Sequence, residues 1–175
     1  VIGCGLMGSG IAEVLARAGL SVVVRDINDD AVAAGRKRIE KSFAKGVERG
    51  KMTEQERDEA LGRLTFTTEL FAELDAIVTD DQAILASNTS SMPIIRFAQA
   101  TSRPERVLGL HFFNPAPVQP LVEIISSVVT APEVADEIEK LSTEVLGKTP
   151  IRSDDRPGFI VNALLIPFLF SAIRM

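Results

Sequence analysis

The chain has 175 residues, of which 46% are hydrophobic and 25% charged, and its formal net charge is −5. These values describe one folded domain, or one domain with part of another, and exclude a disordered chain. The negative charge argues against the basic face that nucleic-acid binding requires, and no apolar run is long and pure enough to cross a bilayer. The single cysteine, Cys4, cannot form an internal disulfide, so we expect a reducing compartment such as the cytoplasm.

Strands and helices alternate from the first residue. Val1 and Ile2 are the end of a predicted strand, so we expect the natural protein to begin earlier. The missing start could include an organellar targeting signal or lack one. We predict a turn at residues 3–8 and a helix at residues 9–18 that Gly19 stops. The β-branched run 21–24 is the next strand. The pattern is a β-α-β unit of the usual length.

The rest of the chain continues this alternation. Helices are predicted at 30–50, 53–64, 71–79 and 132–146, and strands at 65–67, 83–87, 107–112, 121–125 and 150–152. Thr53-Glu54-Gln55-Glu56 matches a capping box at the second of these helices. The order predicts an α/β fold, a Rossmann-type doubly wound sheet over residues 1–155.

Residues from Pro157 to the end are predicted to form a helix that is apolar on nearly every face. Such a helix is normally buried on several sides. We therefore expect residues 156–175 to be the first helix of a C-terminal all-helical domain, or to be covered by a partner chain.

Gly3-Cys4-Gly5-Leu6-Met7-Gly8 matches the G-x-G-x-x-G pattern of dinucleotide-binding loops. The first glycine allows a tight turn, the second lets the backbone approach a pyrophosphate, and the third lets helix and strand pack closely. Asp26 ends the next strand, where a carboxylate binds ribose hydroxyls and repels a 2′-phosphate. We therefore expect NAD rather than NADP. The neighbouring Arg25 is the argument for NADP, because its guanidinium would attract the 2′-phosphate. The alternative is a glycine turn without a ligand.

His111 is the only histidine and lies at the end of the predicted strand 107–112. Ligands of open α/β sheets bind beyond the carboxyl ends of strands, and oxidation of an alcohol needs a base that titrates near neutral pH. Glu123 is a lone acid in an apolar strand, and a buried carboxylate needs a partner such as an imidazole. The alternatives are a core histidine bonded to backbone groups and an edge-strand glutamate facing water.

Two further polar features accompany these residues. Residues 87–91, Ser-Asn-Thr-Ser-Ser, follow a predicted strand and either donate hydroxyls to a substrate oxygen or form a simple turn. Asn162 lies near the start of the last apolar helix, where it either points into an active site or bonds locally.

Taken together, these pieces resemble the 3-hydroxyacyl-CoA dehydrogenase family, which includes the 3-hydroxybutyryl-CoA dehydrogenases. The stretches that carry the resemblance are residues 3–12, 87–91, 109–115 and 157–162, in the family's order. The resemblance implies reversible oxidation of an (S)-3-hydroxyacyl-CoA, with a short acyl chain, by NAD to the 3-ketoacyl-CoA, as in fatty-acid β-oxidation. It also implies a homodimer formed through the C-terminal helical domain, with no metal.

By this resemblance His111 is the catalytic base and Glu123 is the acid that orients it. Ser90 and Asn162 match the residues that bind the substrate oxygen. The positions that match the family's cofactor contacts are Gly3, Gly5, Leu6, Met7, Gly8, Asp26, Ser90 and Asn114.

Ser42 matches a family position that contacts coenzyme A, and Lys51 or Arg49 is expected to meet its phosphates. One alternative is a non-catalytic NAD-binding relative, and the joint presence of the four predicted catalytic residues argues against it. The other is a dehydrogenase of free β-hydroxyacids or sugar acids, and Ser42 with its basic helix favours a CoA ester over it.

The chain departs from the family pattern in two places. Ala163 stands where many members have arginine, which leaves the predicted catalytic set intact. Between Leu70 and Phe71 the family has about twenty more residues, including a strand whose glutamate touches the cofactor. Since the loss of a central strand would leave its neighbours without backbone partners, we expect this segment in the natural protein.

Overall fold

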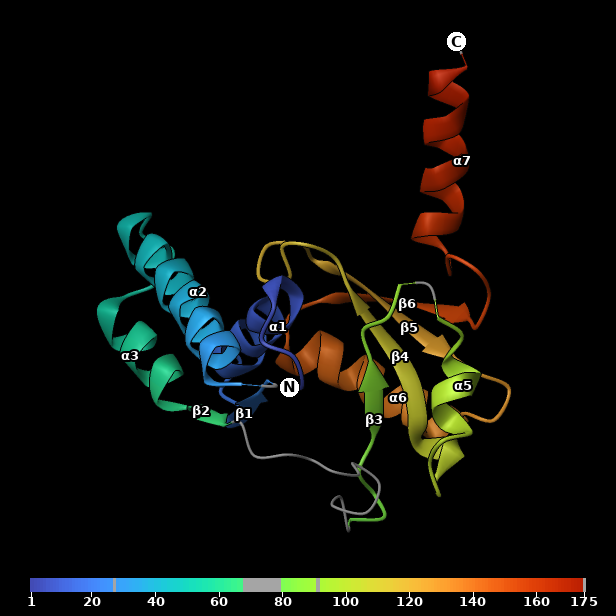
Figure 1. Cartoon of the computed structure of the whole chain (residues 1–175), viewed down its shortest axis with the longest axis horizontal. Coiled ribbons are helices and arrows are strands. Elements are labelled where there is room, and N and C mark those ends of the chain that lie inside the picture. Colours follow the sequence, from blue (N-terminus) through green and yellow to red (C-terminus); the bar gives the residue numbers. More distant parts are fainter. Residues whose placement is uncertain (27, 68–79, 91, 175) are drawn as a thin grey trace. The chain divides into compact units, whose positions relative to one another are not determined.

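The computed structural model describes residues 1–26, 28–67, 80–90 and 92–174. The chain folds as two compact units (Figure 1), Val1–Phe71 with Phe113–Pro120, and Ala72–Phe112 with Leu121–Met175. These two units do not coincide with the predicted domains 1–155 and 156–175. The boundary between those domains stays a prediction. The predicted helix at 71–79 and the junction of Leu70 with Phe71 lie outside the described residues.

The first unit is a small parallel sheet covered by helices. Strand β1 (Val22–Arg25) pairs in parallel with β2 (Leu64–Thr67), and Ile2 bridges to Arg25 in parallel, so the chain start lies beside β1 as predicted. Helices α1 (Leu6–Arg17), α2 (Asp29–Glu48) and α3 (Glu54–Gly62) contact one another and the sheet. Its core is built from small and apolar side chains, among them Cys4, Ala12, Ala16, Val22, Val24, Ile39, Phe43 and Ala60.

Local sequence signals explain where these helices begin. The side chain of Asn28 accepts a hydrogen bond from the backbone N–H of Ala31 at the start of α2. The predicted capping box of α3 is confirmed: the hydroxyl of Thr53 accepts from the N–H of Glu56 at 3.1 Å, and the Glu56 carboxylate accepts from the N–H of Thr53 at 2.7 Å.

The second unit contains a four-stranded sheet in the order β3-β4-β5-β6. The strands are β3 (Leu85–Ser87), β4 (Val107–Phe112), β5 (Leu121–Ser126) and β6 (Thr149–Asp154). The outer pairs β3–β4 and β5–β6 are parallel, whereas β4 and β5 are antiparallel. Only residues Phe113–Pro120 join β4 to β5, too few for the crossover that a parallel pair needs.

Helical segments surround this sheet. They are α5 (Ile94–Ala98), the 3₁₀ turn η1 (Pro104–Arg106), α6 (Pro132–Lys140) and the wider turn η2 (Leu141–Val145) that continues it. The pattern predicts one helix over 132–146, and the structure instead widens its last turn into a π-helix. Helix α5 has no counterpart among the predicted elements.

The last helix, α7 (Val161–Ile173), starts four residues after Pro157, because Gly158 and Phe159 both have positive φ, 75° and 52°. It extends away from the sheet of its own unit (Figure 1), and none of its residues is buried. Leu164, Phe168 and Ile173 are 69–78% exposed. Its cover by a further domain or a partner chain stays a prediction. In the described part of the chain, no helix is long and apolar enough to span a membrane.

Candidate active site

The glycine motif forms the turn that leads from the first strand into α1. Gly3 has a φ of 89°, which a glycine adopts without strain, and its N–H donates to the carbonyl of Arg25 at 2.8 Å. A Cβ on Gly8 would lie 1.8 Å from the carbonyl oxygen of Gly3. Gly5 and Leu6 are exposed where α1 begins, and no side chain caps this helix start. This arrangement suits a pyrophosphate at a helix N-terminus.

Asp26 lies directly after β1 and is tied to the glycine loop. Its carboxylate accepts a hydrogen bond from the N–H of Cys4 at 2.6 Å. The side chain is half-buried, whereas the neighbouring Arg25 is only 7% exposed. The structure therefore places the carboxylate of Asp26 beside the turn, which is the setting that NAD recognition requires.

His111 and Glu123 face each other across the antiparallel pair β4–β5. His111 Nδ1 lies 2.7 Å from Glu123 Oε2, and the two residues are 7% and 0% exposed. Burial of Glu123 excludes the alternative of an edge-strand glutamate facing water. With an ionised Glu123, Nδ1 carries the proton and donates, which gives Nε2 the lone pair that a base needs.

The second oxygen of Glu123 binds the start of α7. Oε1 accepts from the N–H of Ile160 at 3.0 Å and from the N–H of Val161 at 2.8 Å. These two bonds tie the carboxylate to the N-terminus of α7, the end of a helix that interacts favourably with negative charge. The ring of Phe159 packs edge-on against His111, with centroids 5.7 Å apart and an interplanar angle of 64°.

The predicted substrate residues Ser90 and Asn162 belong to the same unit as this pair. Ser90 is exposed in the loop after β3, whose carboxyl end lies at the same sheet edge as that of β4. Asn88 in this loop accepts a hydrogen bond from the N–H of Phe112 at 2.7 Å, which ties the loop to the end of β4. Asn162 is half-buried and follows Val161, whose N–H binds Glu123. The four predicted catalytic residues, Ser90, His111, Glu123 and Asn162, thus lie toward the end of the sheet at which β3 and β4 terminate.

Asn114 is exposed in Phe113–Pro120, which belongs to the other unit. Its peptide bond to Pro115 is cis. Its predicted contact with the cofactor stays a prediction.

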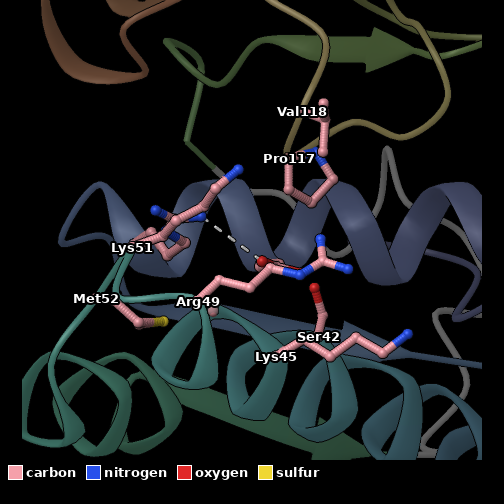
Figure 2. A pocket seen from close by; sticks show the side chains of 10 residues that line it. Ser42, Lys45, Arg49, Lys51, Met52, Pro117 and Val118 are labelled. Carbon is pink, nitrogen blue, oxygen red and sulfur yellow. Dashed lines mark ion pairs between the residues drawn. The ribbon is translucent and has the colours of Figure 1, made fainter.

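A basic pocket of about 310 Å³ lies within the first unit. Ser42, Arg49 and Lys51, the three residues predicted to contact coenzyme A, all line it. Arg17 and Lys45 add two more positive charges, and Pro117 and Val118 form another wall. Figure 2 shows the side chains of Ser42 and Arg49 directed into the space between α2 and the two residues Pro117 and Val118.

The chain as a whole has close counterparts among known proteins. The family model for the NAD binding domain of 3-hydroxyacyl-CoA dehydrogenase matches residues 1–71 and 68–156. The chain belongs to the 3-hydroxyacyl-CoA dehydrogenase family. The predicted α/β Rossmann-type fold, the dehydrogenase class and the cofactor NAD are thereby confirmed.

Relatives of the chain include dehydrogenases of bacteria and mitochondria. It is 52% identical over 198 residues to 3-hydroxybutyryl-CoA dehydrogenase of Mycobacterium tuberculosis, covering all of this chain and 69% of the relative. It is 38% identical over 204 residues to the human mitochondrial hydroxyacyl-coenzyme A dehydrogenase, covering all of this chain and 64% of that protein.

Solved structures of the same family superpose closely. The crystal structure of M. tuberculosis FadB2 matches 99% of this chain and 69% of its own, with 52% identity and a TM-score of 0.96. The crystal structure of Escherichia coli 3-hydroxybutyryl-CoA dehydrogenase matches 99% of this chain and 41% of its own, with 38% identity and a TM-score of 0.91.

Four residues that support this dehydrogenase's glycine loop and base are missing from the sequence-based prediction. Arg38 Nη1 on α2 donates to the carbonyl of Cys4 at 2.8 Å, and the hydroxyl of Ser9 donates to the same oxygen at 2.8 Å. Gly35 admits the thiol of Cys4, since a Cβ there would lie 1.7 Å from Sγ. Burial raises the pKa of the Cys4 thiol, which fits a packing role. Phe159 has a left-handed backbone conformation and its ring contacts His111. Sequence periodicity does not reveal this conformation.

Proposed function

We propose that the protein catalyses the reversible oxidation of an (S)-3-hydroxyacyl-CoA with a short acyl chain to the 3-ketoacyl-CoA, with NAD as hydride acceptor. The observation that carries the proposal is the buried His111–Glu123 pair, in which Nδ1 and Oε2 are 2.7 Å apart. Relatives that are 52% and 40% identical bear the name 3-hydroxybutyryl-CoA dehydrogenase, the second as a probable one, which supports a four-carbon acyl group.

The residues of the glycine loop fit NAD. A Cβ on Gly3 or Gly5 would meet no atom within 4 Å, so the turn leaves space for a pyrophosphate, and Asp26 supplies a carboxylate for the ribose. When bound, the nicotinamide supplies an acceptor for the hydride from the substrate carbon. The hydroxyl proton of the substrate passes to Nε2 of His111, and the C–O bond becomes a carbonyl.

Glu123 serves this proton transfer in two ways. It fixes the imidazole tautomer by accepting from Nδ1, and its negative charge stabilises the imidazolium that forms at Nε2. Ser90 and Asn162 bind the substrate oxygen, Ser90 with a hydroxyl and Asn162 with an amide that donate hydrogen bonds as the oxygen loses its proton.

Coenzyme A carries several phosphates, and the basic pocket of the first unit is suited to them. Arg17, Lys45, Arg49 and Lys51 place four cations around one cavity of about 310 Å³. Lysine and arginine are the residues that proteins use to bind phosphate groups. A free β-hydroxyacid carries one carboxylate, whereas coenzyme A carries several phosphates, so a pocket with four cations favours a CoA ester.

A comparison of two substrates tests this proposal. Consumption of NADH is measured with acetoacetyl-CoA and, separately, with free acetoacetate. We expect turnover with the thioester alone. Turnover of the free acid at a similar kcat/KM would favour a dehydrogenase of free β-hydroxyacids, and no turnover of either substrate would favour a non-catalytic NAD-binding relative.

We further propose that the protein is a homodimer in which the apolar surface of α7 is covered. Leu164, Phe168 and Ile173 are each more than two-thirds exposed, and exposed apolar patches of this kind mark interaction sites. Light scattering coupled to size exclusion should give twice the mass of the chain, and a monomer would contradict the proposal. The cytoplasmic location stays a prediction, and a role in fatty-acid oxidation is supported by a 38% identical relative named fatty acid oxidation complex subunit alpha.

We also propose that the natural protein has further residues between Leu70 and Phe71. The family model matches the chain in two overlapping parts, and the alignment with the M. tuberculosis relative spans 198 positions for the 175 residues of this chain. Peptide mapping of the protein from its natural source tests this. A peptide in which Leu70 is bonded to Phe71 would contradict it.

A further inference from the structure

One acid lies among the cations of the basic pocket, and the proposed reaction does not use it. Glu13 on α1 is the only carboxylate among the described residues that line the cavity. Its side chain is 5% exposed. A buried carboxylate is unfavourable unless it is paired and hydrogen-bonded, so its position in a site for an anionic ligand requires a physical reason.

Glu13 binds one residue from each of the two helices that flank the pocket. Its Oε1 lies 3.8 Å from Nη1 of Arg17, one turn later on α1, and its carboxylate is hydrogen-bonded to Ser42 on α2. Burial raises the pKa of Glu13, and the Ser42 hydroxyl and the Arg17 charge oppose this increase. Both partners line the same cavity.

These contacts determine what Ser42 can offer a ligand. An ionised carboxylate only accepts hydrogen bonds, so the single hydroxyl hydrogen of Ser42 is directed to Glu13. The oxygen of Ser42, which Figure 2 shows directed into the pocket, then has only lone pairs left for a ligand. It is suited to an N–H or O–H group, and a phosphate oxygen at this point would meet lone pairs and the negative charge of Glu13.

Three more cations line the same cavity. Lys45 and Arg49 come from the last turns of α2 and the residue after it, and Lys51 follows. The pocket thus combines hydrogen-bond acceptors, at Ser42 and Glu13, with side chains that bind negative charge. A ligand that carries both N–H or O–H groups and phosphates can satisfy both kinds of side chain.

We propose that Glu13 is a positioning residue for the nucleotide end of coenzyme A: it holds Ser42 as an acceptor for an N–H or O–H group of the ligand and keeps phosphates on the cations. This inference rests on the proposed acyl-CoA substrate. It assigns Ser42 to the adenine amino group, a ribose hydroxyl or a pantetheine amide, and it assigns the phosphates to Lys45, Arg49 and Lys51.

The test compares two substrates that share the reacting carbons. Acetoacetyl-CoA carries the nucleotide, and acetoacetyl-N-acetylcysteamine is a thioester without it. We measure kcat and KM for both at saturating NADH in the wild-type protein and in Glu13→Met, which keeps the volume and removes the acceptor. Glu13→Gln is a second variant if the first does not fold. Glu40→Gln is the matched control, because Glu40 is an exposed acid on α2 paired with Arg36 and does not line the pocket.

Loss of one hydrogen bond between neutral ligand and protein groups changes affinity about three- to tenfold. We expect Glu13→Met to raise KM for acetoacetyl-CoA by about this factor, with kcat, the KM for NADH and all constants for the truncated thioester unchanged. Because Glu13 acts through Ser42, a variant with both Glu13→Met and Ser42→Ala should be no worse than the worse single variant.

The outcomes separate the two proposals. If the wild-type protein shows no preference for the CoA ester over the truncated thioester, the assignment of the pocket to coenzyme A fails. If the wild-type protein has that preference and Glu13→Met keeps it or increases it, the role of Glu13 is overturned while the substrate stands. Effects of the two substitutions that multiply in the double variant would also overturn it, because they would show that Glu13 acts independently of Ser42.

Discussion

The substitution Glu123→Gln is expected to prevent His111 from acting as a base while keeping most of the fold. The amide oxygen of glutamine can still accept the N–H groups of Ile160 and Val161, which the carboxylate binds at 3.0 and 2.8 Å. The amide NH₂ then faces Nδ1 of His111 and donates to it, so the ring proton moves to Nε2. In that tautomer the ring cannot take the hydroxyl proton of the substrate.

The size of the effect follows from this exchange of tautomers. The same carboxylate-to-amide change in a Ser-His-Asp triad lowers kcat about 10⁴-fold, which corresponds to about 5.5 kcal/mol of transition-state stabilisation. We expect a decrease between about 10²- and 10⁴-fold here. Glu123→Ala leaves the two backbone N–H groups without their buried acceptor, at about 1–3 kcal/mol each, so it should lower the free energy of unfolding by about 2–6 kcal/mol.

Two assays separate these effects: NADH oxidation with acetoacetyl-CoA, and urea unfolding. Glu144→Gln is the control, since Glu144 is an exposed acid in the same unit. The reasoning is refuted if Glu123→Gln retains kcat within a few-fold of the wild-type value. It is equally refuted if the loss of activity merely follows the fraction of unfolded protein.

Three further predictions follow from the structure. Gly8→Ala should abolish NADH binding in a fluorescence titration, because its Cβ would lie 1.8 Å from the carbonyl of Gly3, whereas Gly62→Ala, with no atom within 4 Å of its Cβ, should bind normally. Burial raises the pKa of Glu13 above its unfolded value, so the free energy of unfolding should decrease as pH rises from the ordinary carboxyl range through the raised pKa; a Glu13→Gln variant that keeps this decrease in urea titrations would contradict the attribution. Phe159→Ala should lower stability by about 3–5 kcal/mol and reduce kcat, and Phe159→Gly should be no less stable than Phe159→Ala, because glycine adopts a φ of 52° without strain; a clearly less stable glycine variant in urea unfolding would argue against strain at this position.

Much of the site was accessible from short-range patterns. The spacing of Gly3, Gly5 and Gly8 before a helix indicates the turn, because few residues other than glycine fit those positions. A lone acid in an apolar strand requires a partner, and this requirement points from Glu123 to His111 before any geometry is known. The antiparallel pairing of β4 and β5 was not predicted, although the eight residues of Phe113–Pro120 that join them are too few for a crossover.

The features that escaped prediction depend on contacts between distant parts of the chain. Helix α5 has only five residues, and its first N–H groups, those of Ile94 and Ile95, are capped by Asp155 at 2.9 Å, some sixty positions later. The link from Arg38 to the carbonyl of Cys4 depends on how α2 packs on the glycine loop. Helix propensity alone places the start of the last helix at Pro157, and the left-handed Phe159 delays it.

The central claim is that His111 is the base of an NAD-dependent dehydrogenase. Steady-state turnover of acetoacetyl-CoA and equilibrium binding of NADH, both measured in His111→Ala, test this claim most directly. We predict that kcat falls by at least about 10²-fold, the lower end of general-base contributions, while the Kd for NADH stays within about twofold of the wild-type value, a change of less than about 0.5 kcal/mol. Turnover near the wild-type rate, or loss of NADH binding in parallel with activity, would contradict the account.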